Sequence, residues 1–224
     1  AVRPGRTMLV IGETPSNPRL DLIDLDELGA IMGPFTVVDS TFATPLGQQP
    51  LRHGVDITLH SATKGIAGQN DATLGVIAGE RDLIDGIWAY SVLHGAVASP
   101  YDALNGLKGI RTLGVRQRHQ SESALAIATA LVDHPGVARV FHPGLADHPQ
   151  HELATRQLRS WPTVLALDLE GGLDAARTML DTIRIARPAT SLGGPETLVC
   201  HPGSSTHASL DPDEQAAIGI TPGL

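Results

Sequence analysis

The chain holds two lysines beside fourteen arginines, so each lysine is a candidate for chemistry that arginine cannot perform. A guanidinium stays protonated, whereas a desolvated lysine can become a neutral amine that reacts with a carbonyl carbon. Lys64 follows the strand-like run "VDITLHSA", and sites in open α/β sheets lie where such strands end. Lys108 lies in the helical pattern "LNGLKGIRTL" with its charge toward solvent. We therefore interpret Lys64 as the candidate reactive amine and Lys108 as structural.

Two hydroxyl residues, Ser61 and Thr63, stand just before this lysine. Hydroxyls together with free backbone N–H groups at the end of a strand suit a phosphate group. The pattern Ser-x-Thr-Lys is weak by itself, because each hydroxyl could instead cap a turn. The two residues are therefore candidates for phosphate binding whose weight depends on their neighbours.

Asp39 closes the apolar run "FTVVD". An ionised carboxylate at the end of a buried strand is costly unless it faces a cation, and a protonated heterocyclic nitrogen is a suitable one. The alternative is that Asp39 caps the following turn, "STFATP". An amine, a phosphate site and a carboxylate that keeps a pyridine ring protonated are together what pyridoxal 5'-phosphate requires.

Four apolar runs position these residues and predict strands, and the first two lack polar alternation, which predicts burial on both faces. The runs are residues 7–14, 35–42, 55–62 and 71–79. Between the first two, apolar residues recur at helical spacing, and Gly33-Pro34 ends that pattern. A strand, a helix and a strand in this order predict a βαβ unit and hence a parallel sheet.

The later part of the chain has a different pattern. Residues 80–133 are typical of helices, with a break at 98–102, and shorter strands then alternate with helices. We expect a domain boundary inside the long helix at 116–133. This boundary divides the chain into the larger domain, residues 1–120, and a smaller α/β domain, residues 121–224.

Composition disfavours several classes of function. The net charge of -8 argues against nucleic-acid and membrane-surface partners, and no apolar run reaches membrane-spanning length. The single cysteine, Cys200, excludes an internal disulfide and fits a reducing cytoplasm. No G-x-G-x-x-G follows a strand, and no Walker A motif occurs. Histidines gather in "FHPGLADHPQH" and "HPGSSTH", but Pro and Gly interrupt both segments, so we assign no metal.

Longer motifs resemble those of the pyridoxal-phosphate enzymes of cysteine and methionine metabolism, over essentially the whole chain and in the same order. They are "GETPSNP", "VVDSTFATP", "HSATKGIAGQNDATLGV", "GLKGIRTLGVR", "HPGLADHPQHELA" and "SLGGPETLVCHPGSSTH". This family includes cystathionine γ-synthase, cystathionine γ-lyase, methionine γ-lyase and the O-acyl-homoserine sulfhydrylases. The resemblance implies an α/β fold: the large domain of a fold-type I transferase, a mostly parallel sheet with flanking helices whose N-terminal part is missing, followed by an incomplete smaller α/β domain.

The resemblance also implies roles for the candidate residues. Lys64 would form the internal aldimine with pyridoxal 5'-phosphate and later move protons, and Asp39 would pair with the pyridinium nitrogen. Ser61 and Thr63 would bind the phosphate, and Asn17 would form a hydrogen bond near the phenolic oxygen of the cofactor.

For the substrate, the resemblance implies contacts at Thr190 and Ser191. Thr190 stands where cystathionine enzymes usually carry Glu, which favours methionine γ-lyase-like or sulfhydrylase-like specificity. Ser40 and Gly65 also depart from the family, which has Asn and an aromatic residue there. The implied reaction is γ-elimination or γ-replacement on a sulfur amino acid or an O-acyl-homoserine, by a cytoplasmic homotetramer built as a dimer of dimers.

The resemblance places other family features outside this sequence. The Gly-rich phosphate loop and the tyrosine that stacks on the ring belong upstream of Ala1, and the arginine that binds the substrate carboxylate belongs just after Leu224. We therefore expect half of a site and weak or absent turnover from this chain by itself. The alternative hypothesis is a catalytically inactive, truncated or pseudo-enzyme module that only oligomerises.

Overall fold

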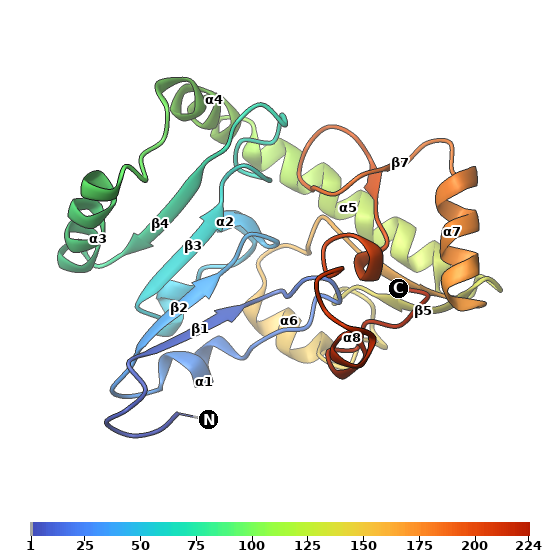
Figure 1. Cartoon of the computed structure of the whole chain (residues 1–224), viewed down its shortest axis with the longest axis horizontal. Helices are drawn as coiled ribbons and strands as arrows, with labels where there is room; N and C mark the ends of the chain where they lie inside the picture. Colours follow the sequence, from blue (N-terminus) through green and yellow to red (C-terminus); the bar gives the residue numbers. More distant parts are fainter. Residues whose placement is uncertain (1) are drawn as a thin grey trace.

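The largest sheet is the scaffold of the molecule. The structure is a computed structural model, and it describes residues 2–224. Figure 1 shows this sheet on one side of the molecule and the later, smaller sheets on the other, with the long helix α5 running from one to the other. Its four strands are β1 (Leu9–Glu13), β2 (Phe35–Asp39), β3 (Ile57–Ser61) and β4 (Gly75–Gly79).

Strand direction in this sheet follows from the connections. Strands β1, β2 and β3 run parallel, and α1 (Leu25–Gly29) lies between β1 and β2 along the chain, so the predicted βαβ unit is confirmed. Strand β4 pairs antiparallel with β3, and the loop at residues 62–74 joins the end of β3 to the start of β4 at the same edge of the sheet. That loop carries the candidate lysine at the carboxyl edge of the sheet.

One face of the sheet packs on α1 and is buried. The carboxylate of Asp24 caps α1 by accepting hydrogen bonds from two backbone N–H groups of its first turn. Leu25 and Leu28 then join Val38 of β2 and Val55 in a buried hydrophobic cluster. This cluster fixes β2, the strand that ends in the candidate carboxylate.

The other face of the sheet is largely open, so the prediction that the strands are buried on both faces is wrong for β1. It holds in the middle of β2, where Val37 on this face and Val38 on the opposite face are both buried. Ile11 of β1, Phe35 of β2 and Ile77 of β4 are 66%, 49% and 45% exposed. The register and the alternation of side chains put these three residues on the same face as Asp39. An unbroken apolar run indicates two apolar faces, but it carries no information on whether both are covered.

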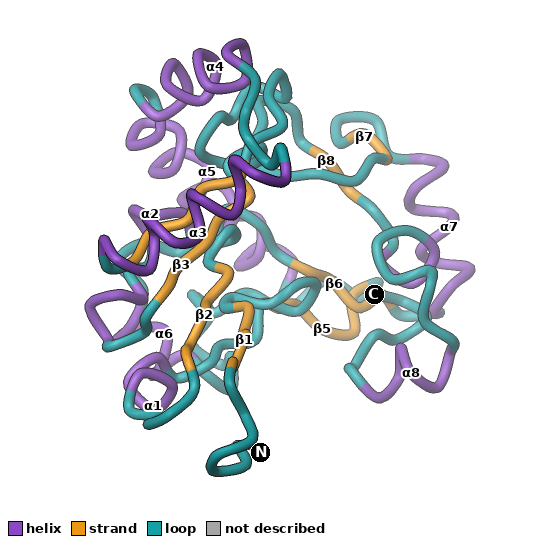
Figure 2. The backbone as a smooth tube through the Cα atoms, turned by 60° about the vertical axis from the view of Figure 1, so that its left-hand side comes forward, coloured by secondary structure: helices purple, strands orange, loops and turns teal. Residues whose placement is uncertain are grey.

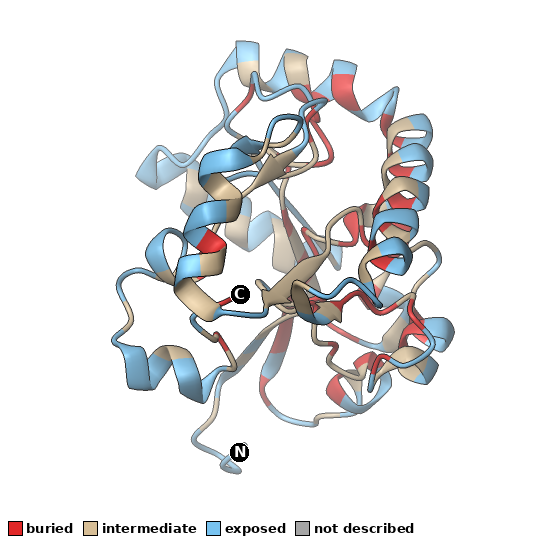
Figure 3. Cartoon of the chain, turned by 90° about the vertical axis from the view of Figure 1, so that its right-hand side faces the viewer, coloured by how far each residue is buried: buried red, intermediate tan, exposed pale blue. Residues whose placement is uncertain are grey.

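Three helices follow the sheet, and the helical prediction for residues 80–133 is confirmed. The break falls at 95–99 instead of 98–102, because Ser99 caps the second helix and Pro100 takes its first position. The helices are α3 (Arg81–His94), α4 (Pro100–Ile110) and α5 (Leu113–Leu131). Buried residues occur in α4 and α5 but not in α3, and Figure 3 shows exposed residues along the outer surfaces of the helices.

The remaining chain forms small sheets and short helices, as the predicted alternation requires. Its strands β5 (Val137–Phe141) and β6 (Ala166–Leu169) pair antiparallel, and β7 (Arg187–Pro188) and β8 (Leu198–Val199) pair parallel. Its helices are α6 (His151–Gln157), α7 (Gly172–Thr182) and α8 (Pro212–Ala217). The other short elements of the chain are α2 (Thr44–Gly47), η1 (Pro50–His53) and η2 (Pro202–Ser204). The division into two domains stays a prediction.

Two glutamines at α6 bind the backbone that leads into α1, and Figure 2 shows α6 beside α1. Gln150 accepts from the Leu22 N–H and donates to the Leu22 carbonyl oxygen, both over 2.7 Å. Gln157 accepts from the Leu25 N–H over 2.9 Å and donates to the Ile23 carbonyl oxygen over 3.0 Å. Each side-chain amide thus supplies the donor and acceptor that a neighbouring strand would supply.

The helices that the structure describes include none long and apolar enough to cross a bilayer.

Candidate active site

Three polar residues end neighbouring strands at the carboxyl edge of the sheet. Glu13, Asp39 and Ser61 are the last residues of β1, β2 and β3. The register pairs Glu13 with Asp39, and it pairs Asp39 with Leu59, two positions before Ser61. Side chains in register, or two positions apart, face the same side of a sheet. The three polar groups therefore lie together on the open face, at the edge where open α/β sheets place their sites.

Thr41 holds both Asp39 and Ser61 in position. The Oδ1 atom of Asp39 accepts hydrogen bonds from the backbone N (2.9 Å) and the Oγ1 (2.6 Å) of Thr41. The Oγ1 of Thr41 accepts a further bond from the backbone N of Ser61 (2.8 Å). Asp39 thus caps the turn, as the alternative hypothesis expected, while its second oxygen has no hydrogen bond among the described residues. One oxygen fixes the carboxylate, and the other is available to a cation.

The electrostatics of this edge favour a cationic ligand group. Burial raises the pKa of Glu13; the Asn17 N–H, which donates to Glu13 Oε2 over 3.0 Å, lowers it, and the charge of Asp39 raises it. Behind the edge, burial lowers the pKa of His60, and the charge of Asp39 offsets part of that by raising it. The carboxylate of Asp39 therefore acts on titratable neighbours on both faces of the sheet.

Lys64 lies in the loop after β3, and its amine meets a residue from far along the chain. Its Nζ donates a hydrogen bond to Ser191 Oγ over 3.1 Å. Ser191 has a φ of 141°, a value that residues other than glycine rarely adopt. Such strain persists where the surroundings impose it, and it gathers at functional sites. The structure thus brings together the predicted reactive amine and one predicted substrate contact.

Three other predicted site residues have weaker surroundings. The Oγ1 of Thr63 accepts from the Leu74 N–H over 2.9 Å and lies 3.4 Å from the Leu74 carbonyl oxygen, so this hydroxyl supports the loop. Asn17 has an exposed side chain and reaches Glu13 through its backbone. Thr190 is exposed beside Ser191. The roles of Thr63, Asn17 and Thr190 stay predictions.

Two further contacts join the Lys64 loop to the segment that carries Ser191, and sequence reasoning missed both. A Cβ atom at Gly193 would lie 2.5 Å from the backbone N of Gly65, so the two backbones touch and only glycine fits. Asn70 Nδ2 donates to Glu196 Oε2 over 2.6 Å. These contacts span more than a hundred positions, and no local pattern in the sequence indicates them.

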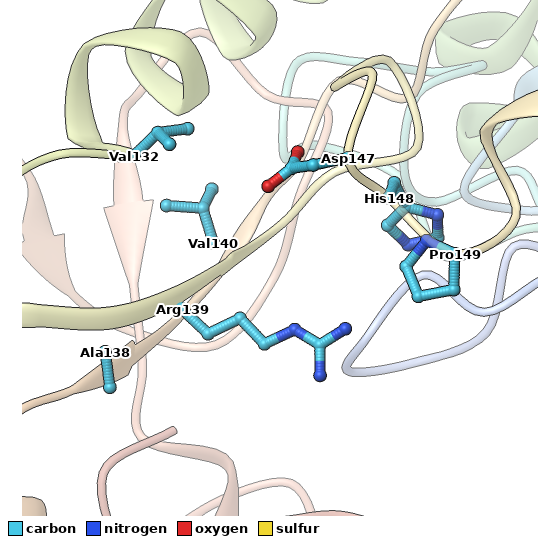
Figure 4. Close-up of a pocket in the computed structure, with 7 residues that line it drawn as sticks. All are labelled: Val132, Ala138, Arg139, Val140, Asp147, His148 and Pro149. Atoms are coloured by element: carbon cyan, nitrogen blue, oxygen red, sulfur yellow. The ribbon is translucent and has the colours of Figure 1, made fainter.

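The clustered histidines do not form a metal centre in the part of the chain that the structure describes, where no group of three or more His, Cys, Asp or Glu is placed to hold an ion. His142 is buried, with Nε2 3.3 Å from the carbonyl oxygen of Pro162. His148 lines a small cavity beside β5 together with Arg139 (Figure 4). Burial lowers the pKa of His148, the charge of Asp21 raises it, and the charge of Arg139 lowers it.

Comparison with known proteins identifies the family. The sequence profile of the Cys/Met metabolism PLP-dependent enzymes matches residues 1–224. The chain belongs to this family. An L-methionine gamma-lyase of Fusobacterium nucleatum subsp. polymorphum is 38% identical over 224 residues, which cover 97% of this chain and 57% of the relative. An O-succinylhomoserine sulfhydrylase of Pseudomonas aeruginosa is 41% identical over 217 residues, which cover 96% of this chain and 54% of the relative.

Solved structures give the same result for this Cys/Met metabolism protein. The crystal structure of cystathionine gamma synthase from Xanthomonas oryzae pv. oryzae in complex with aminoacrylate and cysteine is 42% identical, with a TM-score of 0.92. The match covers 96% of this chain and 57% of that chain, and a second structure of the enzyme, in complex with cystathionine, matches equally. The predicted α/β class with a mostly parallel sheet is confirmed. The chain spans about half the length of the curated relatives it matches.

Pyridoxal 5'-phosphate is the cofactor of the Cys/Met metabolism family, and the residues present here fit it. Asp39 offers a fixed carboxylate with one oxygen free of hydrogen bonds among the described residues, which suits a protonated ring nitrogen. Among the described residues, the Ser61 hydroxyl has no hydrogen-bond partner, so it is available to a phosphate oxygen. Lys64 has an amine that could react with the aldehyde carbon. The chemistry of these donors therefore matches the three parts of the cofactor.

Proposed function

We propose that this protein acts in pyridoxal-phosphate-dependent γ-elimination or γ-replacement on a sulfur amino acid or an O-acyl-homoserine. The observation that carries the proposal is the hydrogen bond from Lys64 Nζ to Ser191 Oγ (3.1 Å). The amine of Lys64 is thus within hydrogen-bond distance of a hydroxyl from the segment between β7 and β8. Lys64 follows the strand β3, which ends in Ser61, and the neighbouring strand β2 ends in Asp39.

The residues of the chain divide the work. Bound pyridoxal phosphate would supply an electron sink for carbanion chemistry. Asp39, which Thr41 holds by two hydrogen bonds, would keep the ring nitrogen protonated. Lys64 would hold the aldehyde carbon of the cofactor and, once freed from it, would take and return protons at the carbons of the substrate. A tethered amine does both at a high effective concentration, and Ser191 would orient it.

The finer features of the proposal rest on resemblance. Thr190 supports methionine γ-lyase-like or sulfhydrylase-like specificity, and two of the relatives carry those names. We place the working enzyme in the cytoplasm, in line with its single cysteine, as a homotetramer that is a dimer of dimers. The alternative of an inactive module is not favoured, because these relatives are named as enzymes.

The two lysines of the chain allow a direct test. The protein, together with any sequence that its gene adds on either side, is mixed with pyridoxal phosphate, reduced with borohydride and digested. Mass spectrometry then measures the label on each lysine. We expect Lys64 to carry at least about tenfold more label than the exposed Lys108 of α4, because a positioned amine reacts at a high effective concentration.

Two variants complete the test. Lys64→Ala should abolish both the selective label and the release of a 2-oxoacid from methionine or an O-acyl-homoserine. Lys108→Ala is the matched control, and it should leave both unchanged, because Lys108 is exposed on α4. Equal labelling of the two lysines in the unmodified protein would contradict the proposal.

A further inference from the structure

A guanidinium lies directly behind the turn that follows the reactive lysine. Arg116, in the first turn of α5, donates from Nη1 to the Gly65 carbonyl oxygen (2.7 Å) and from Nη2 to the Ile66 carbonyl oxygen (3.1 Å). Its Nη2 also donates to the carbonyl oxygen of Gly109, in the last turn of α4 (2.8 Å), and its Nε donates to Thr112 Oγ1 (2.9 Å). One side chain thus joins α4 and α5 to the lysine turn.

The acceptors of Arg116 are all neutral. Among the described residues, no carboxylate forms an ion pair with it. Burial lowers the pKa of Arg116, which is the cost of holding a cation away from water without a counter-ion. The planar fork of a guanidinium repays that cost by binding several carbonyl oxygens at fixed angles, which a single ammonium cannot do.

Close backbone approaches hold the same turn from several sides. Gly68 has a φ of 67°, and a Cβ atom there would lie 1.9 Å from Arg116 Nη1, so the guanidinium rests on the glycine backbone. A Cβ atom at Gly109 would lie 2.1 Å from the Ala67 carbonyl oxygen. Within the turn, the N–H groups of Ala67 and Gly68 donate to the Ala62 and Lys64 carbonyl oxygens, both over 2.8 Å. The turn is therefore built against α4 and α5, and only small residues permit it.

We propose that Arg116 is a positioning residue, which fixes the turn after β3 so that the Lys64 amine points at Ser191. The turn carbonyls of Gly65 and Ile66 follow Lys64 directly, so their anchoring sets where its side chain begins. The link to cofactor chemistry rests on the proposed function, whereas the anchoring of the turn does not.

Hydrogen exchange tests the anchoring. Arg116→Met removes the fork, Arg116→Lys keeps the charge, and Arg118→Met makes the same change at an exposed arginine of α5. We expect exchange at the Ala67 and Gly68 amides to rise about tenfold in both Arg116 variants, because buried carbonyls lose their donors, and to stay unchanged in Arg118→Met. Unchanged exchange in Arg116→Met would overturn the proposal, as would an equal rise at the β2 amides, which indicates general loss of stability.

Selective labelling tests the consequence for the amine. Both Arg116 variants should lower the Lys64-to-Lys108 label ratio severalfold, and Arg118→Met should preserve it. If Arg116→Lys restores the wild-type ratio and exchange, charge alone suffices and the positioning role of the fork is wrong. If the unmodified protein does not prefer Lys64, the proposed function fails, and the exchange data alone decide whether Arg116 anchors the turn.

Discussion

The two faces of the four-stranded sheet differ in what they do. Val38 and His60, on the face that α1 covers, are 0% and 5% exposed, whereas Ile11 and Phe35, on the other face, are 66% and 49% exposed. Asp39 lies at the end of the open face. The covered face supplies apolar burial, and the open face presents polar groups to a ligand. Substitutions on the two faces should therefore separate stability from chemistry.

The largest effect is expected in the covered core. Leu25→Ala removes a fully buried side chain that packs on Val38, so it should lower the free energy of unfolding by about 2–5 kcal/mol. Urea denaturation followed by circular dichroism measures this change. Leu93→Ala, at an exposed position of α3, is the matched control and should cost less than about 0.5 kcal/mol. A loss below about 1 kcal/mol for Leu25→Ala would show that this core adds little.

A smaller effect is expected in the pH dependence of stability, where His60 on the covered face interacts with Asp39 on the open face. Burial lowers the pKa of His60 below 6.5, its value in the unfolded chain, so folding favours the neutral ring. The stability that this preference contributes is present above pH 6.5 and is lost as the pH falls through the lower pKa of the folded state. His60→Gln should therefore flatten the acid side of the stability curve, by at most about 1.4 kcal/mol per pH unit.

Unfolding free energies of the wild type and of His60→Gln, measured between pH 7 and pH 5, test this. His142 and His148 also have lowered pKa values, but they are present in both proteins, so their contributions cancel in the difference. The charge of Asp39 opposes the burial effect at His60 and also acts on Glu13, so Asp39→Asn should steepen the acid side more when His60 is present than when it is replaced. A double-mutant cycle isolates that coupling. Parallel curves for the wild type and His60→Gln would mean that the pKa of His60 does not differ between the folded and unfolded states.

Local signals made one half of the site predictable. Asp39 and Ser61 end strands, Lys64 follows one, and the carboxyl ends of parallel strands share an edge, so sequence order alone brings them together. The link from Asp39 to Thr41 also had a local signal, because an aspartate commonly bonds the backbone N–H two residues on. Sequence reasoning considered such a cap, yet it did not find that the Thr41 hydroxyl also binds Ser61.

The other half of the site depends on contacts that have no local signal. The bond from Lys64 to Ser191 crosses 127 positions, and the bond from Arg116 to Gly65 crosses 51. Resemblance to a family pointed to Ser191 but gave no reason to single out Arg116. Periodicity also failed on the open face, because an apolar pattern predicts which side chains are apolar and leaves unknown what covers them. Strand type was thus predictable, and strand burial was not.

The smallest expected effect tests the open face itself. Ile11 and Val10 are neighbours on β1, but Val10 packs against the buried cluster beneath α1, while Ile11 faces the open side. Ile11→Ala should change the free energy of unfolding by less than about 0.5 kcal/mol, and Val10→Ala should cost about 1 kcal/mol or more. Both are read from the same urea titrations. If Ile11→Ala costs as much as Val10→Ala, Ile11 is covered in solution.

Repeating the titration at several protein concentrations then shows whether a second copy of the chain covers Ile11. Such a copy would make the cost of Ile11→Ala rise with protein concentration.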